Sequence, residues 1–147
     1  MKDLKNAKRI VIKVGTSTLT HETGKINLRR LSKLCLVLAD LHNSGREVVL
    51  VTSGAIGVGV GKLGLKERPK DIPGRQAAAT VGQCELMFMY DKFFGEYGVK
   101  TGQLLITKSD IENDIRCVIN ELTVGLPKSE MTCMFSIPPF QVSKNKY

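Results

Sequence analysis

The chain has few aromatic residues and no tryptophan, and this limits the partners that its surface can bind. Aromatic residues make up 5% of the 147 residues, whereas lysines and arginines outnumber acidic residues 22 to 14, for a net charge of +8. Proteins that bind single-stranded nucleic acid combine aromatic platforms with a basic stripe, but here the basic residues are spread along the chain. We therefore expect no nucleic-acid partner, and a solvated basic surface that attracts small anions.

Patterns typical of metal sites and membrane segments are also missing from the sequence. Its four cysteines, at positions 35, 84, 117 and 133, form no Cys-x-x-Cys pair, and it has only two histidines, so no metal site is expected. No apolar run is long enough to span a membrane, and no apolar segment of a signal peptide follows the basic N-terminus. A single-domain cytoplasmic protein with reduced thiols and no membrane partner is the expectation.

The order of apolar and turn residues predicts a βαβ unit near the N-terminus. Residues 9–14 and 47–51 are short, β-branched runs typical of buried strands. Between them, Asn27 is expected to cap an amphipathic helix, in which leucines recur at steps of three and four residues until Gly45 ends it. Strand, helix and strand with short links predict a parallel sheet with a right-handed crossover.

The later part of the sequence is less regular. The glycine-rich stretch 54–64 is expected to be a loop, and a helix over 74–94 and a third strand over 102–107 are expected to follow. A further helical piece is expected from about residue 109, where Asp110, Glu112 and Asp114 would complement the helix dipole. Beyond residue 116 the apolar residues follow no period, which predicts a poorly ordered end.

Two turns at the ends of the first two strands carry the candidate functional residues. Lys13 is followed by Gly15-Thr16-Ser17, and the second strand runs into Ser53-Gly54-Ala55. Ligands of parallel sheets bind at the carboxyl ends of the strands, where small residues leave backbone N–H groups accessible. The N–H and hydroxyl groups of the first turn would donate hydrogen bonds to phosphate oxygens. The charge of Lys13 would stabilise a transferring phosphoryl group. The alternative is an edge lysine beside two turns that bind no ligand.

Other patterns of the chain are judged not to be functional sites. Residues 59–64 match G-x-G-x-x-G, and Gly61-Lys62 is reminiscent of a Walker loop, but Leu63 stands where serine or threonine is required. These glycines are expected to allow close packing instead. His21 and His42 have no evident partners in the sequence, and both are expected at the surface.

The turn sequences resemble those of a known family. Residues 13–20, KVGTSTLT, and 51–56, VTSGAI, resemble the beginning of the glutamate 5-kinases, within the amino-acid kinase superfamily. Gly82-Gln83 and the segments 102–107 and 110–114 agree with the same family. The resemblance covers about residues 8–116. It implies that residues 1–116 are the N-terminal part of an amino-acid kinase domain, and that residues 117–147 are a divergent or truncated tail. The implied fold is α/β, the N-terminal portion of a three-layer sandwich with a mainly parallel sheet.

The resemblance also implies an activity. These kinases use ATP to phosphorylate the side-chain carboxylate of glutamate, and the product, glutamyl 5-phosphate, is the first intermediate toward proline. By this resemblance, Lys13 is catalytic and binds ATP together with Gly15, Thr16 and Ser17. Ser53, Gly54 and Ala55 would bind L-glutamate, and Mg²⁺ would bridge the phosphates without an assigned protein ligand. A cytoplasmic homo-oligomer is expected.

Some alternatives stay open. Acetylglutamate kinases and aspartokinases are related, although the Gly-Thr-Ser turn favours glutamate 5-kinase. A complete kinase of this family has a later Asn-Glu-Asn-Asp segment, of which residues 118–121, VINE, resemble only the start. The competing hypothesis is therefore a catalytically inactive kinase fragment that binds anions or a partner.

Overall fold

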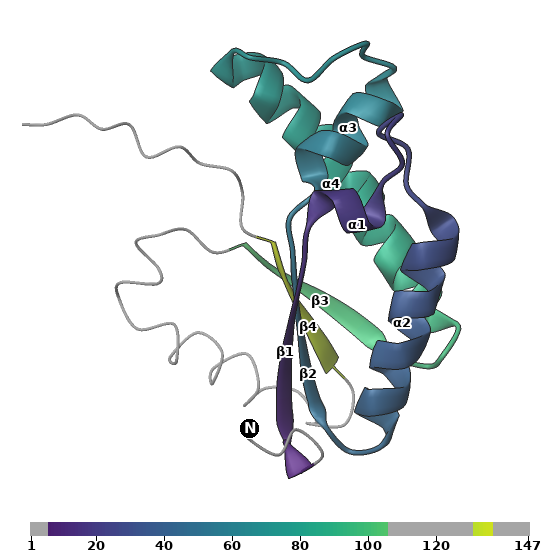
Figure 1. Cartoon of the computed structure of the whole chain (residues 1–147). Coiled ribbons are helices and arrows are strands. Elements are labelled where there is room, and N and C mark those ends of the chain that lie inside the picture. Colours follow the sequence, from purple (N-terminus) through teal and green to yellow (C-terminus); the bar gives the residue numbers. More distant parts are fainter. Residues whose placement is uncertain (1–5, 106–130, 137–147) are drawn as a thin grey trace, which may run out of the picture.

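Four strands form one parallel sheet in the part of the chain that the structure describes, residues 6–105 and 131–136 of a computed structural model (Figure 1). The strands are β1 (Arg9–Val14), β2 (Glu47–Thr52), β3 (Lys100–Leu105) and β4 (Met131–Ser136). Their order is β1-β2-β4-β3, and each neighbouring pair is parallel. Parallel pairing brings the carboxyl ends of these strands to one edge of the sheet. The expected α/β fold with a parallel sheet is confirmed.

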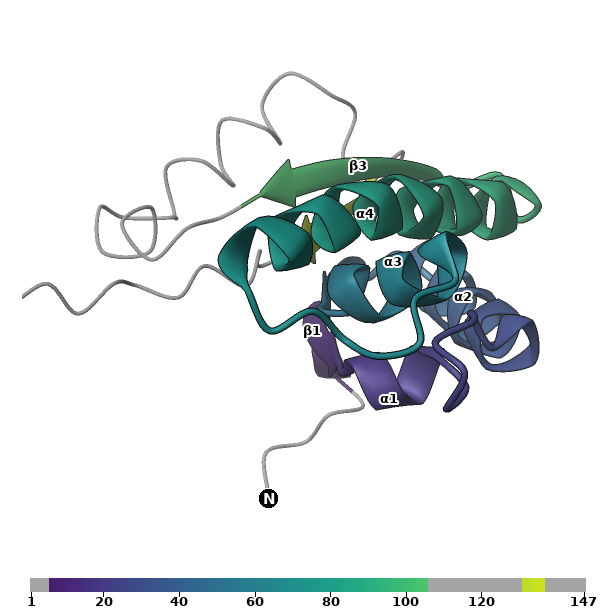
Figure 2. The same cartoon turned by 90° about the horizontal axis from the view of Figure 1, so that it is seen from above.

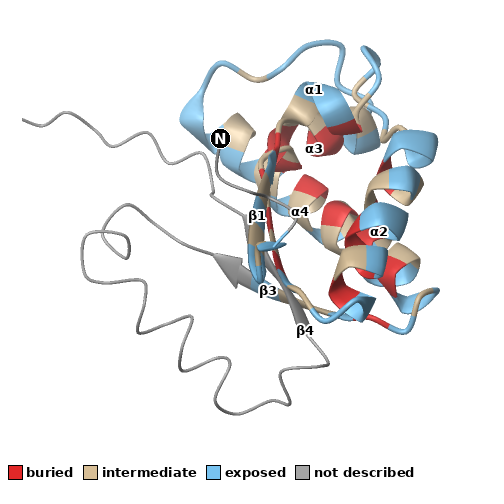
Figure 3. Ribbon diagram, turned by 60° about the horizontal axis from the view of Figure 1, so that its bottom comes forward, coloured by how far each residue is buried: buried red, intermediate tan, exposed pale blue. Residues whose placement is uncertain are grey.

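The helices lie on one face of this sheet (Figures 1 and 2). They are α2 (Leu28–Asn43), α3 (Ala55–Leu63) and α4 (Ile72–Gly95), with the single turn α1 (Thr16–Leu19) at the carboxyl end of β1. Alternate strand residues, such as Val48 and Leu50, are buried beneath them, whereas Val11 on the opposite face is 61% exposed. Figure 3 shows the buried residues gathered between the sheet and the helices. The second covering layer of the expected sandwich stays a prediction.

Helix α2 forms as its sequence predicts. The side chain of Asn27 accepts a hydrogen bond from the backbone N–H of Arg30 at 3.1 Å, which satisfies a free donor in the first turn. Gly45, just beyond the helix, has a φ of +88°, in the left-handed region that glycine adopts at little cost. His42 was expected at the surface, but it is only 8% exposed. It lies one turn beyond Leu38 on the buried side of α2, so the helical period could have placed it in the core.

The glycine-rich segment 54–64 was expected to be a loop, but most of it forms the helix α3. This helix is stabilised by close contact with α4, which its glycines allow. A Cβ atom on Gly59 would lie 1.8 Å from the carbonyl oxygen of Ala78, and one on Gly82 would lie 1.8 Å from that of Ala55. The two backbones therefore approach where any side chain would clash. Glycine disfavours helices locally, but this contact outweighs that preference. The expectation of close packing is confirmed for Gly59 and Gly61, where an added Cβ would overlap backbone atoms, but not for Gly64, and the segment is a helix in place of the loop.

The C-terminal part of the chain contributes a strand that the sequence pattern does not predict. β4 pairs with β2 on one side and with β3 on the other, so residues 131–136 lie inside the sheet. The poorly ordered end expected there is wrong for these residues. The helical piece expected near residue 109 and the VINE segment at 118–121 lie outside the described residues. The division of the chain at residue 116 stays a prediction.

The contact between α3 and α4 predicts that one methyl group added at position 82 strongly destabilises the fold. Gly82→Ala should lower the free energy of unfolding by about 1–3 kcal/mol, because the new Cβ would overlap the backbone of α3. The matched control is Gly95→Ala in the same helix, where an added Cβ meets no atom within 4 Å, and it should change stability by less than about 1 kcal/mol. Urea unfolding followed by circular dichroism measures both. Wild-type stability in Gly82→Ala would contradict the contact.

Candidate functional site

The two predicted turns lie side by side at the carboxyl edge of the sheet. Val14 and Thr52, the last residues of β1 and β2, are partners in the strand register. The backbone N–H of Ser53 donates to the carbonyl oxygen of Val14 at 3.3 Å. Across the turns, the hydroxyl Oγ1 of Thr16 donates to the carbonyl oxygen of Ser53 at 2.7 Å. The structure therefore brings together residues 15–17 and 53–55, as the sequence predicts.

Each turn opens a helix, so backbone donors gather at this edge. Gly15 is the N-cap of α1 and Gly54 that of α3, and neither makes a side-chain capping bond. The first N–H groups of a helix have no acceptor within it, and the helix dipole adds partial positive charge there. A Cβ on Gly15 would meet no atom within 4 Å, so space is open beside this turn. The edge suits anionic ligands, namely phosphates and carboxylates.

Lys13 lies on the face of the sheet opposite the helices. Exposure alternates along β1, so Arg9, Val11 and Lys13 are exposed, whereas Val14 is buried against the helices. Lys13 is opposite Val51 of β2 in the register, one residue before the strand ends. Its flexible four-carbon stem allows the ammonium group to turn toward the carboxyl edge. Lys13 is therefore next to the turns along the chain, and its side chain starts from the other face.

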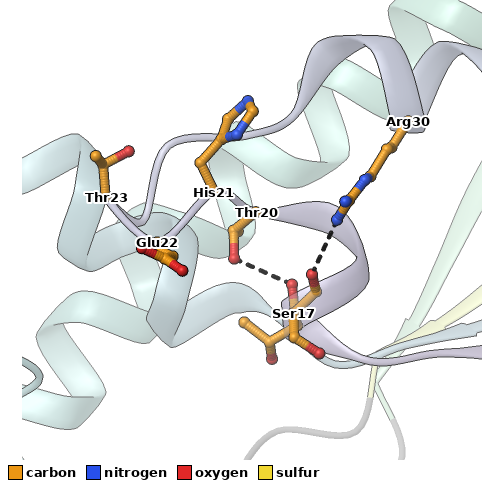
Figure 4. Close-up of a pocket in the computed structure, with 7 residues that line it drawn as sticks. Ser17, Thr20, His21, Glu22, Thr23 and Arg30 are labelled. Atoms are coloured by element: carbon orange, nitrogen blue, oxygen red, sulfur yellow. Dashed lines mark hydrogen bonds between the residues drawn. The ribbon is translucent and has the colours of Figure 1, made fainter.

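A hollow of about 910 Å³ lies beside α1 (Figure 4). Of the predicted site residues it includes only Thr16 and Ser17; its remaining lining residues are Thr20, His21, Glu22, Thr23 and Arg30. Arg30 donates to the carbonyl oxygen of Ser17 at 3.5 Å. Sequence reasoning missed Arg30, which lies in the first turn of α2, and no local pattern distinguished it from other surface arginines.

The remaining predicted residues do not line this hollow. Lys13, Gly15, Ser53, Gly54 and Ala55 lie elsewhere along the carboxyl edge or in the strand that leads to it. Ala55 is buried at 7% exposure, whereas Ser53 and Gly54 are partly exposed. The candidate site is therefore the shared edge of the two turns, and the hollow borders it only through Thr16 and Ser17.

A buried tyrosine supports the second turn from below. The Tyr90 hydroxyl of α4 donates to Oγ1 of Thr52 at 3.4 Å, and both side chains are fully buried. The Tyr90 ring stacks on Phe94, with ring centroids 6.1 Å apart. Burial raises the pKa of Tyr90 above its usual value, partly offset by the bond to Thr52, so the phenol stays neutral. The sequence placed Tyr90 in the helix but did not indicate its contact with the turn.

Within the described residues there is neither a metal-ligand cluster nor a membrane-spanning helix. They contain no group of three or more histidine, cysteine, aspartate or glutamate residues placed to hold a metal ion. None of the helices described here is long and apolar enough to cross a membrane.

Comparison with known proteins identifies the family. The model of the amino acid kinase family matches residues 8–127. The chain belongs to the amino acid kinase family. Among its curated relatives, the glutamate 5-kinase of Moorella thermoacetica is 58% identical over 122 residues, which cover 83% of this chain and 32% of the relative. That of Clostridium perfringens is 58% identical over 113 residues (77% and 42%), and that of Listeria welshimeri is 63% identical over 105 residues (71% and 38%).

These comparisons confirm the resemblance to glutamate 5-kinases, but only over part of the length of those relatives. The matched segments are 32–42% of the length of these relatives, so the chain spans well under half of each. The family match extends to residue 127, past the limit near 116 that the resemblance suggested. The individual roles of Lys13 and of the two turns remain predictions.

Burial predicts that two cysteines, Cys35 and Cys84, differ in reactivity. Cys35 is fully buried, and desolvation raises its pKa to about 12, whereas Cys84 is exposed. Because the thiolate is the reactive form, iodoacetamide at pH 8 should modify Cys84 of the folded chain and leave Cys35 unmodified. Mass spectrometry of the peptides that contain each cysteine measures this. After unfolding in urea, both should react, and modification of Cys35 in the folded chain at the rate of Cys84 would contradict its burial.

Proposed function

We propose that this chain is a kinase that uses ATP to phosphorylate the side-chain carboxylate of glutamate. The product would be glutamyl 5-phosphate, in the first step of proline biosynthesis. Two lines support the proposal: the relatives named glutamate 5-kinase at 58–63% identity, and the contact between the two turns. The observation that carries it is the 2.7 Å hydrogen bond from Thr16 to Ser53, which holds the two turns together at one edge of the sheet.

The reaction requires the two substrates to meet at this edge. A carboxylate oxygen of glutamate attacks the γ-phosphorus of ATP, a P–O bond forms, and the bond to the β-phosphate oxygen breaks to release ADP. Phosphoryl transfer depends mainly on positioning and on stabilising the negative charge of the phosphates. In the proposal, Gly15, Thr16 and Ser17 position the phosphates, and the ammonium group of Lys13 stabilises the transferring group.

The second turn would hold the other substrate. In the proposal, Ser53, Gly54 and the first N–H groups of α3, starting at Ala55, bind glutamate. Mg²⁺ bound together with ATP would supply positive charge that offsets the negative charge of the phosphates, and the proposal assigns it no ligand among the described residues. A cytoplasmic location and assembly into a homo-oligomer belong to the same proposal and rest on the sequence alone.

The proposal predicts glutamate-dependent release of ADP by the purified 147-residue chain. Lys13→Ala should reduce this rate about 100-fold or more, the effect typical of losing one group that stabilises the transition state. The matched control is Lys33→Ala, because Lys33 is an exposed lysine on α2 that makes none of the ion pairs found within the described residues. It should release ADP at the wild-type rate.

The negative outcomes separate the alternatives. A folded chain that binds glutamate and an ATP analogue but releases no ADP would support the inactive-fragment hypothesis over the kinase proposal. A folded chain that binds neither substrate would overturn both substrate assignments. A Lys33→Ala variant as impaired as Lys13→Ala would show that the loss reflects net charge, and that position 13 has no special role.

A further inference from the structure

Thr16 touches both turns of the candidate site. It is the first residue of α1 and is partly buried. Its hydroxyl donates to the carbonyl oxygen of Ser53 at 2.7 Å. A Cβ added to Gly54 would lie 3.8 Å from the Cα of Thr16 and 3.9 Å from its hydroxyl oxygen, so a side chain at position 54 would touch Thr16. Thr16 therefore links the two turns by a hydrogen bond and lies close to Gly54 of the second turn.

The hydroxyl of Thr16 is committed to this link. A threonine hydroxyl has one hydrogen to donate, and in this structure that hydrogen points to Ser53. To donate to a phosphate oxygen, the side chain would first have to release the second turn. Thr16 would therefore contribute to phosphate binding through its backbone N–H, while its side chain holds the second turn.

Gly57 of α3 leaves room for the side chain of Thr16 in this orientation. A Cβ on Gly57 would lie 2.6 Å from the methyl carbon Cγ2 of Thr16, closer than two carbon atoms can pack. Threonine is branched at Cβ and has few χ1 choices, so moving its methyl group also moves its hydroxyl. A side chain at position 57 would therefore turn the Thr16 hydroxyl away from Ser53. The glycine keeps the linking orientation open.

We propose that Thr16 is a positioning residue that couples the two turns, so that a phosphate ligand at residues 15–17 and a carboxylate ligand at residues 53–55 strengthen each other's binding. The identity of the two ligands rests on the proposed function; the coupling rests on the Thr16 contacts. Each ligand orders one turn, and the hydrogen bond passes part of that order to the other. By thermodynamic linkage, the two ligands must change each other's affinity by the same factor.

The experiment measures this factor in the full 147-residue chain. Calorimetry gives the Kd of L-glutamate without and with saturating β,γ-imido ATP and Mg²⁺. In the wild type, the nucleotide analogue should lower this Kd roughly fivefold, which corresponds to about one net hydrogen bond. Thr16→Val keeps the shape of the side chain and removes the donor, so the Kd should become independent of the analogue. Thr18→Val, the same change at an exposed threonine of α1, is the matched control and should keep the factor.

A pair of compensating substitutions tests the role of Gly57. Gly57→Ala should abolish the coupling although the Thr16 hydroxyl is still present, because the added Cβ displaces the Thr16 methyl group. Thr16→Ser removes that methyl group and keeps the hydroxyl. The double variant Thr16→Ser/Gly57→Ala should therefore recover the coupling that Gly57→Ala loses. A loss of stability that does not arise from the clash with the Thr16 methyl group would not be repaired in this way.

The outcomes that overturn the proposal are distinct from failure of the proposed function. Full coupling in Thr16→Val, or no recovery in the double variant, would overturn the role of Thr16. If the wild type binds neither ligand, the proposed function fails. Hydrogen exchange at the backbone amides of residues 53–55 then tests whether the hydrogen bond from Thr16 to Ser53 stabilises the second turn in the unliganded chain. Exchange should be faster in Thr16→Val and Gly57→Ala and return to the wild-type rate in the double variant. Unchanged exchange in both single variants would overturn the link.

Discussion

The parallel pairing of β1 with β2 is the constraint on which the rest of the structure depends. Parallel strands need a crossover, and here α2 supplies it over the face that buries Val48 and Leu50. The same pairing puts Val14 opposite Thr52, so the chain leaves both strands at the same edge. Turns that are far apart in the sequence thereby become neighbours. The candidate site is a consequence of this register, because a shift of the strands would separate Thr16 from Ser53.

The contact between α3 and α4 gives the second turn a rigid base. α3 starts directly at that turn, and Gly59 and Gly82 let it lie against the backbone of α4. The same long helix carries Tyr90, whose hydroxyl meets Thr52 beneath the turn. Residues 52–55 are thus held by α4 from below and by Thr16 from the side. These contacts order part of the turn before a ligand arrives and leave the rest to be ordered by the ligand, which lowers the ordering cost of binding.

Predictability from the sequence differed between elements for physical reasons. β1, α2 and the first two turns follow local rules, namely β-branched runs, the Asn27 cap and the helical period, so they could be predicted. α3 could not, because glycine disfavours helices locally and the compensating contact comes from α4, which lies further along the chain. β4 was missed for a similar reason, since its place comes from pairing with β2 and β3, and its apolar residues show no alternation.

By itself, the sequence determined the parts that neighbouring residues decide: the βαβ unit, the two small-residue turns after the strands, and the family to which their motifs belong. The tertiary structure alone decided how those parts meet. It committed the Thr16 hydroxyl to Ser53, put Lys13 on the face opposite the helices, and placed Tyr90 beneath the second turn. Such features depend on the distance between atoms that are remote in the chain, and only the strand register and the close approach of the helices set those distances.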